Sequence, residues 1–220
     1  MGYYDNVNQD LLGALPSGLG RVIELGCGAG AMARAYRQKS PNVNWTGIEL
    51  MPDQAELAKE FVNQVYSCDV EANWPLGQDE TFDCLVIGDV LEHLRDPWAI
   101  LSKFVSHLKS GATTAICIPN VGHWTVIANL LLGHFPYQNQ GILDKTHLRF
   151  FTLSSMLDLH RQAGIEPVKV IPRNIPVDAA KYKNFSDAMA QFSQVFNQKH
   201  ESLASRVLAM QYVIVGKKNS

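Results

Sequence analysis

The stretch that decides the fold is VIELGCGAG, residues 22–30. An apolar run carries Glu24 near its end and is followed by three glycines at alternate positions. This pattern predicts a buried strand that enters a tight turn at the start of a helix. The glycines are Gly26, Gly28 and Gly30. Because glycine has no Cβ, the backbone can take a positive φ and a ligand can lie close to the main chain. The first two glycines and Ala31 also satisfy the G-x-G-x-x-G/A pattern, so the turn predicts a nucleotide-like cofactor without specifying which.

Three further apolar segments also end at polar residues. The first of them ends at Glu49, about 20 residues after the glycines, where a carboxylate can accept hydrogen bonds from both ribose hydroxyls of an adenosine-type ligand. Another ends at Asp69, and the last breaks into a polar turn at Gly88 and Asp89. The glycine turn with Glu49 is compatible with NAD or with S-adenosylmethionine, so the later strand ends have to decide between them.

The four strand ends, in this order and spacing, resemble the class I S-adenosylmethionine-dependent methyltransferases. A bacterial subgroup that occurs alone or joined to glycosyltransferases in glycan-modifying systems is similar in further places. These are YYDNV at 3–7, DVLEHLRDP at 89–97, IPN at 118–120 and GILDKTHLRFFT at 141–152. Glu24 stands where many relatives carry Asp, and its longer side chain should still reach the same partner. The resemblance implies S-adenosylmethionine as the cofactor and a small-molecule or glycan-linked acceptor.

The resemblance also implies how the cofactor is held. The glycine turn lets the methionine part approach the backbone, Glu24 lies near its ammonium group, and Glu49 holds the ribose. Asp69 hydrogen-bonds the adenine amino group beside Val70, and the Gly88–Asp89 turn closes around the methionine end. The expected cofactor-binding residues are Glu24, Gly26, Cys27, Gly28, Gly30, Glu49, Leu50, Asp69, Val70, Gly88 and Asp89.

Composition favours one domain over residues 1–220 and a small acceptor. The chain has 220 residues, 46% of them hydrophobic, which is enough for one sizeable core and short for two full domains. A net charge of -2 and a pI near 6.4 do not indicate the excess of Lys and Arg that binding to nucleic acid or an anionic membrane needs. Four cysteines without C-x-x-C spacing fit a reducing cytoplasm. No signal peptide and no membrane-spanning apolar run is expected.

Strands and helices alternate along the chain. Strands are expected at 21–25, 44–49, 64–68, 82–87, 112–118, 166–171 and 207–215. Helices are expected at about 30–39, at 52–62, from Asp96–Pro97 to a stop at Gly111, and at 152–163 before Gly164. Alternating elements predict a Rossmann-like, doubly wound α/β fold, with seven mostly parallel strands, the last antiparallel, and helices on both faces. Ligands then bind at the carboxyl ends of the strands.

Two segments fall outside this minimal pattern. Residues 122–148 carry an apolar, helix-like piece at 126–132 and then an aromatic loop, and we expect them to cover the acceptor. Residues 177–205 are polar and read as a helical insertion before the last strand, on the sheet edge or in a possible homodimer. The expected acceptor-binding residues are Tyr3, Tyr4, Trp124 and Tyr137.

Methyl transfer requires little from the protein, because the sulfonium already activates its methyl group. Alignment of the nucleophile is needed, with removal of its proton when it is a hydroxyl, and histidine does this best near neutral pH. The expected catalytic residues are His93, His147, Arg149 and His123. Each of these residues also has a purely structural alternative. His93 could only stabilise its turn by hydrogen bonds, and His147 and Arg149 could only fasten Asp144 to the following helix. His123 could only line the pocket. No metal is expected, since the histidines do not share a helix or strand; that His93, His123 and His147 together bind a metal stays an open alternative.

The sequence therefore predicts a cytoplasmic methyltransferase that acts on a hydroxyl. Two alternatives stay open: N-methylation of an amino sugar or amine, and a non-catalytic S-adenosylmethionine-binding subunit that uses residues 122–148 as a partner surface. An NAD-dependent oxidoreductase follows from the glycines alone, and no Tyr-x-x-x-Lys pair supports it.

Overall fold

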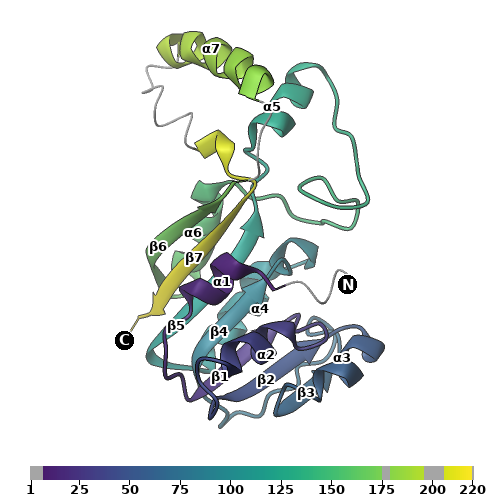
Figure 1. Cartoon of the computed structure of the whole chain (residues 1–220), viewed down its shortest axis with the longest axis vertical. Helices are drawn as coiled ribbons and strands as arrows, with labels where there is room; N and C mark the ends of the chain where they lie inside the picture. Colours follow the sequence, from purple (N-terminus) through teal and green to yellow (C-terminus); the bar gives the residue numbers. More distant parts are fainter. Residues whose placement is uncertain (1–6, 175–178, 196–205, 220) are drawn as a thin grey trace.

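The computed structural model describes residues 7–174, 179–195 and 206–219, and a seven-stranded sheet runs through it (Figure 1). The strands are β1 (Arg21–Leu25), β2 (Asn44–Glu49), β3 (Gln64–Ser67), β4 (Phe82–Gly88), β5 (Leu108–Pro119), β6 (Ile165–Arg173) and β7 (Gln211–Lys218). Their order is β3-β2-β1-β4-β5-β7-β6. Neighbours from β3 to β5 pair parallel, and β7 is antiparallel to both β5 and β6. The predicted Rossmann-like sheet with an antiparallel last strand is confirmed.

Helices cover both faces of the sheet, as predicted. They are α1 (Gln9–Ala14), α2 (Ala31–Arg37), α3 (Pro52–Ala58), the 3-10 helix η2 (Leu91–His93), α4 (Pro97–Ser106), α5 (Trp124–Leu131), α6 (Leu153–Gln162) and α7 (Ala179–Val195). Side chains of β4 point alternately to two cores. Val86 belongs to the core under α1, α2 and α3, and Ile87 belongs to the core under α4 and α6. This alternation follows from the two-residue period of a strand.

The end of α4 differs from its prediction. The helix begins as expected, with Asp96 Oδ1 accepting from Ala99 N at 3.0 Å and Pro97 in the first turn. It ends at Ser106 and not near Gly111, because Leu108 pairs with Phe82 and starts β5. Gly111, at φ +72°, lies inside that strand, where the register with β4 shifts. Strand pairing outweighs the helical spacing of the apolar residues here.

Other boundaries shift by a few residues. β7 starts at Gln211 and runs to Lys218, later than the predicted 207–215, and the short helix α1 was not predicted. Its N-cap Asn8 accepts from Leu11 N at 3.1 Å. The predicted helix at 152–163 is confirmed as α6, with Thr152 and Ser155 forming a capping box and Gly164 following at φ +82°.

The segments outside the minimal pattern lie together at one end of the molecule (Figure 1). α5 covers most of the apolar piece in residues 122–148, and α7 occupies part of 177–205. The Trp124 ring of α5 lies 6.2 Å from the ring of Tyr182 and 5.7 Å from that of Phe185 in α7. The rest of 177–205, apart from α7, lies outside the described residues. Among the described helices, none is long and apolar enough to cross a membrane.

Candidate active site

The glycine turn joins the carboxyl ends of β1 and β2. The amides of Gly26 and Cys27 both donate to the Ile48 carbonyl, at 2.8 and 3.2 Å, which holds the turn against β2. The three glycines of the turn have φ of +74°, +51° and +79° along the chain. At the first of them, Gly26, a Cβ would also lie 2.4 Å from Val90 Cγ2, so this position excludes any side chain. The turn therefore presents backbone where the resemblance expects the cofactor.

Glu49 lies at the end of β2, facing that turn. The residue is 6% exposed; its Oε2 accepts from Gly28 N and its Oε1 from Met51 N, each at 2.9 Å. A carboxylate oxygen has two lone pairs, so each keeps one acceptor position for a ribose hydroxyl. The predicted role of Glu49 thus fits its surroundings, and Leu50 beside it is 62% exposed.

Glu24 is the second buried carboxyl at this edge. It is 6% exposed, and its Oε2 accepts from the indole Nε1 of Trp45 at 2.8 Å. Burial raises the pKa of Glu24 to about 8, the Trp45 hydrogen bond opposes this, and the charge of Glu49 adds to it. Such a carboxyl is mostly protonated at neutral pH and ionises readily beside a cation. This property suits the contact with the methionine ammonium that we expect.

The turn after β3 contains Asp69 and Val70. Asp69 is exposed, and its Oδ1 accepts from Glu71 N at 2.9 Å. Its carbonyl accepts from Asn73 N at 2.8 Å, so the carboxylate stands on a closed turn. Val70 is buried against the core.

The turn after β4 is strained and acidic. Asp89 has φ +54°, alone among the described non-glycine residues in taking a positive φ. Its amide donates to the Cys117 carbonyl at 3.1 Å, and its carboxylate accepts from the Gln211 side chain. Burial raises the pKa of Asp89 to about 6, with Arg173 opposing. Gly88 before it lies against Leu11, whose Cδ2 would be 3.2 Å from an added Cβ.

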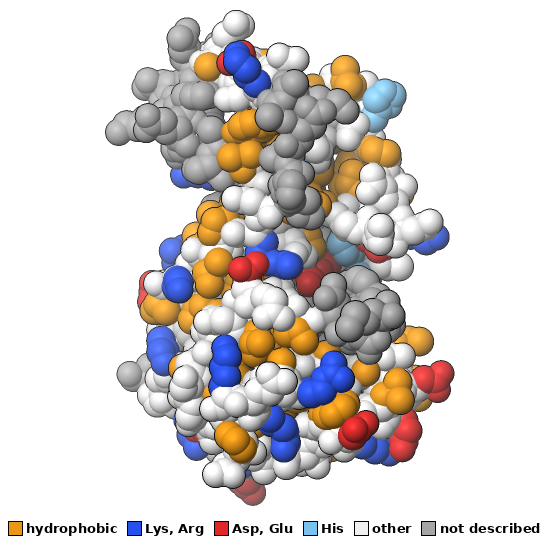
Figure 2. All heavy atoms as spheres, viewed as in Figure 1, with side chains coloured by type: hydrophobic (Ala, Val, Ile, Leu, Met, Phe, Trp, Pro, Cys, Tyr) orange, Lys and Arg blue, Asp and Glu red, His pale blue; other side chains and the backbone are white. Residues whose placement is uncertain are grey.

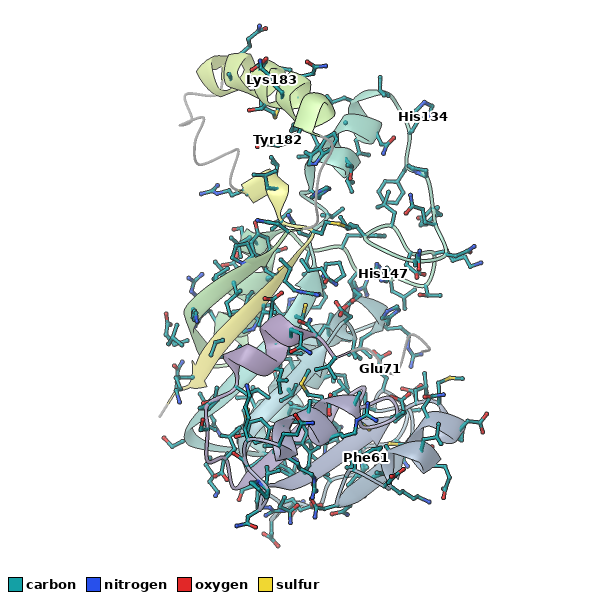
Figure 3. The ribbon with its side chains drawn as sticks, in the orientation of Figure 1. Phe61, Glu71, His134, His147, Tyr182 and Lys183 are labelled. Atoms are coloured by element: carbon teal, nitrogen blue, oxygen red, sulfur yellow. The ribbon has the colours of Figure 1, made fainter. Side chains whose placement is uncertain are left out.

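Beyond this turn the structure brings two of the predicted catalytic histidines together. The rings of His93 and His147 lie edge to face, with centroids 4.7 Å apart at 79°. His93 Nδ1 lies 3.3 Å from the Thr146 carbonyl, and His147 Nδ1 lies 3.0 Å from the Ile142 carbonyl. Burial lowers the pKa of His147, and the hydrogen bond with the Ile142 carbonyl opposes this. Figure 3 places His147 where the long loop after α5 returns to the sheet.

Two other predicted catalytic residues lie in different surroundings. His123 is the N-cap of α5, where its Nδ1 accepts from Thr125 N at 3.4 Å, and burial lowers its pKa. Within the described part of the chain it has no ring contact or hydrogen bond with His93 or His147. Arg149 donates to the Arg95 carbonyl, with Nε at 3.0 Å, and its guanidinium lies 6.0 Å from the Trp98 ring centroid. Arg149 thus fastens the loop to the start of α4.

The predicted acceptor residues are divided. Trp124 is buried between α5 and α7, and its Nε1 has no hydrogen-bond partner among the described residues. Tyr137 is 64% exposed and lies 5.2 Å from the Phe135 ring, which lies 5.5 Å from the Phe150 ring. Tyr3 and Tyr4 lie outside the described residues.

The sequence analysis missed Glu92. This residue is 1% exposed, and among the described residues neither of its carboxylate oxygens has a hydrogen-bond partner. Burial and the neighbouring charge of Asp89 raise its pKa well above the ordinary value. Its placement between Leu91 and Leu94, both buried, was the available signal, because an acidic residue in an apolar frame needs a partner.

The fold and these turns define an α/β protein that holds a nucleotide-like cofactor at the carboxyl ends of its strands. Residues 4–170 match a family described as a methyltransferase domain, and the chain belongs to this family. It is an S-adenosylmethionine-dependent methyltransferase, which confirms the predicted reaction class and cofactor.

Individual relatives agree with this assignment. A ubiquinone biosynthesis O-methyltransferase of Idiomarina loihiensis is 26% identical over 180 residues, which are 77% of this chain and 69% of the relative. One from Xanthomonas campestris pv. campestris is 31% identical over 105 residues, 46% of this chain and 42% of the relative. A crystal structure of an S-adenosylmethionine-dependent methyltransferase from Archaeoglobus fulgidus has the same fold, with a TM-score of 0.62, 19% identity, and coverage of 92% of this chain and 87% of that one.

Proposed function

We propose that the chain methylates a hydroxyl oxygen of a small-molecule or glycan-linked acceptor, and that the acceptor hydroxyl lies at the His93–His147 pair. The contact between these two rings, at the end of the strand whose turn closes on the methionine part, is the observation that carries the proposal. The O-methyltransferases among the relatives support an oxygen acceptor.

In the transfer, the acceptor oxygen bonds to the methyl carbon while the carbon–sulfur bond breaks. The sulfur takes the electron pair and becomes a neutral thioether. The hydroxyl proton has to leave during this exchange, and this is the step at which the protein assists. In this proposal the hydroxyl meets the histidine pair and its proton passes to an imidazole Nε2, because Nδ1 of each ring already faces a carbonyl.

Aromatic side chains near the pair suit a ring-shaped acceptor. Phe135 and Tyr137, on the loop that leads to His147, form a cluster with Phe150, whose ring lies 6.3 Å from that of His147. Figure 2 shows hydrophobic side chains exposed on this part of the surface. Aromatic faces stack on the apolar face of a sugar or on a flat ring, and a covered site keeps water away from the methyl group. This cluster supports the proposal that residues 122–148 cover the acceptor.

The experiment uses S-adenosylmethionine labelled with carbon-13 at the methyl group and fractions of small and glycan-linked bacterial metabolites. Carbon-13 chemical shifts distinguish an O-methyl from an N-methyl product before the acceptor is identified. We expect O-methyl signals that require both the enzyme and the cofactor. N-methyl signals alone would contradict a hydroxyl acceptor and indicate an amine, which has less need of a base.

A further inference from the structure

Three metal-ligating side chains meet beyond the turn after β4. One potential ligand atom from each of Glu92, His93 and His147 lies within 4.8 Å of the other two. The first two residues belong to η2, and the third comes from the loop before α6. In Figure 2, histidine and acidic side chains lie together in the hollow beside that loop.

The surroundings of Glu92 favour a cation. Its carboxyl group is buried with neither oxygen hydrogen-bonded among the described residues. A buried carboxyl without a partner is unfavourable unless it is neutral or lies against a positive charge. The backbone at this residue is held firmly, because its carbonyl accepts from Leu148 N at 2.8 Å and Arg149 N at 2.9 Å. These bonds also tie the loop that carries His147 to η2.

Nδ1 of each histidine already faces a backbone carbonyl. His147 Nδ1 faces the Ile142 carbonyl at 3.0 Å, and His93 Nδ1 faces the Thr146 carbonyl at 3.3 Å. An imidazole that donates through Nδ1 to a carbonyl keeps an unprotonated Nε2, and this arrangement orients most ligating histidines in proteins. Thr146 is held in turn, since its hydroxyl donates to Asp144 Oδ1 at 2.7 Å. The outer contacts of a metal site are therefore present around both rings.

We propose that Glu92, His93 and His147 bind a divalent transition-metal cation, for which Zn²⁺ is the best match. Two imidazoles and one carboxylate suit Zn²⁺ and its neighbours better than Mg²⁺ or Ca²⁺, which prefer oxygen ligands. Tetrahedral bonds of about 2.1 Å place ligand atoms about 3.4 Å apart. The three ligand atoms lie within 4.8 Å of one another, so binding would draw the side chains together by about an ångström. Three protein ligands leave a position open for a water or a hydroxyl.

The consequence for catalysis rests on the proposed function. A hydroxyl bound to the cation loses its proton to water more easily, and the deprotonated oxygen then attacks the methyl carbon as the carbon–sulfur bond breaks toward sulfur. With the ion bound, the two imidazoles act as its ligands, and water takes the proton in place of an imidazole. Binding of the cation does not depend on this step, so it is tested by itself.

The experiment uses the full chain without a polyhistidine tag, stripped with EDTA and desalted. Zn²⁺ is titrated in competition with a chromogenic chelator, and Co²⁺ absorption reports the coordination geometry. We expect one Zn²⁺ per chain, and a loss of affinity of at least about 30-fold in Glu92→Gln and His147→Ala. The matched control is His134→Ala, an exposed histidine on the same loop and away from the cluster (Figure 3). It should bind Zn²⁺ as wild type does, and S-adenosylhomocysteine titration without metal checks that every variant is folded.

Each outcome decides the proposal. Binding below one equivalent in wild type, or wild-type affinity in Glu92→Gln and His147→Ala, overturns the cation site. Zn²⁺ binding that depends on these residues supports the site even if no acceptor is methylated, in which case only the proposed function fails. If methylation needs His93 and persists fully in EDTA, the proposed function holds and the role of the cation in the transfer is wrong.

Discussion

Buried polar groups are hydrogen-bonded at one end of the candidate site and lack described partners at the other. Toward the cofactor, the carboxyls of Glu24 and Glu49 accept from Trp45 Nε1 and from backbone amides. Toward the acceptor, Glu92 has no described partner for either oxygen, and neither has the indole nitrogen of Trp124. Unpartnered buried groups are rare in folded proteins and usually mark a place for a ligand, ion or water. If the proposed sites are right, the fold alone satisfies the carboxyls on the cofactor side, whereas a bound group would satisfy Glu92 on the acceptor side.

The strongest test of this comparison is His93→Ala. If the hydroxyl loses its proton at the histidine pair, either to an imidazole or with the help of a cation held there, turnover should fall roughly 10²–10⁴-fold, and S-adenosylhomocysteine affinity should stay nearly unchanged. Initial rates and calorimetry measure the two quantities. His134→Ala is the control, and a loss in His93→Ala below about 10-fold would assign the proton to another group or the methyl to an amine.

Glu49→Ala tests the cofactor side. The variant should weaken S-adenosylhomocysteine binding by about 1.5–3 kcal/mol, the range for a hydrogen bond to a charged group. Because Glu49 also holds the amides of Gly28 and Met51, thermal unfolding must show that the fold persists. Wild-type affinity in a folded variant, or tighter binding of NAD than of S-adenosylhomocysteine by wild type, would contradict the assigned ribose contact.

Tyr137→Ala and Arg149→Ala test the cover with a smaller expected effect. The KM for the acceptor should rise several-fold, on the order of 1 kcal/mol, with cofactor affinity preserved, since contacts to non-reacting parts of a substrate first affect binding. Arg149→Ala should act by releasing the loop from the Arg95 carbonyl. Unchanged acceptor kinetics in both variants would make residues 122–148 a packing or partner surface.

The remaining prediction concerns the stability of the fold, and it depends on Glu24 and pH. Its pKa in the folded protein, about 8, exceeds the ordinary value of 4.5, so the native state binds the extra proton and the free energy of unfolding falls as pH rises between these values. Glu24→Gln keeps an acceptor for Trp45 and removes this titration. Its Tm should exceed that of wild type clearly at pH 8, by more than the few degrees that about 1 kcal/mol gives, and match it near pH 4.5. Equal differences at both pH values would show that the titration of Glu24 is not responsible.

The sequence predictions succeeded where the interactions are local in the chain and failed where they join distant segments. The glycine turn and Glu49 could be found because a strand, a tight turn and an acidic strand end are local patterns that recur at a fixed spacing. The predicted end of α4 was wrong, because the helix is ended by the pairing of Leu108 with Phe82, which are distant in the chain. Glu92 was missed for a related reason: only the packed structure reveals that its oxygens lack partners.

By itself, the sequence determined the order of strands and helices, the parallel sheet and the acidic residues at the strand ends, because periodicity and turn residues act over a few positions. Only the tertiary structure decided that His93 meets His147 beside Glu92, while His123 caps α5 and Arg149 holds the loop. Those contacts depend on how a long loop returns to the sheet. Their free energy comes from packing and hydrogen bonds between segments far apart in the chain, and no local pattern records it.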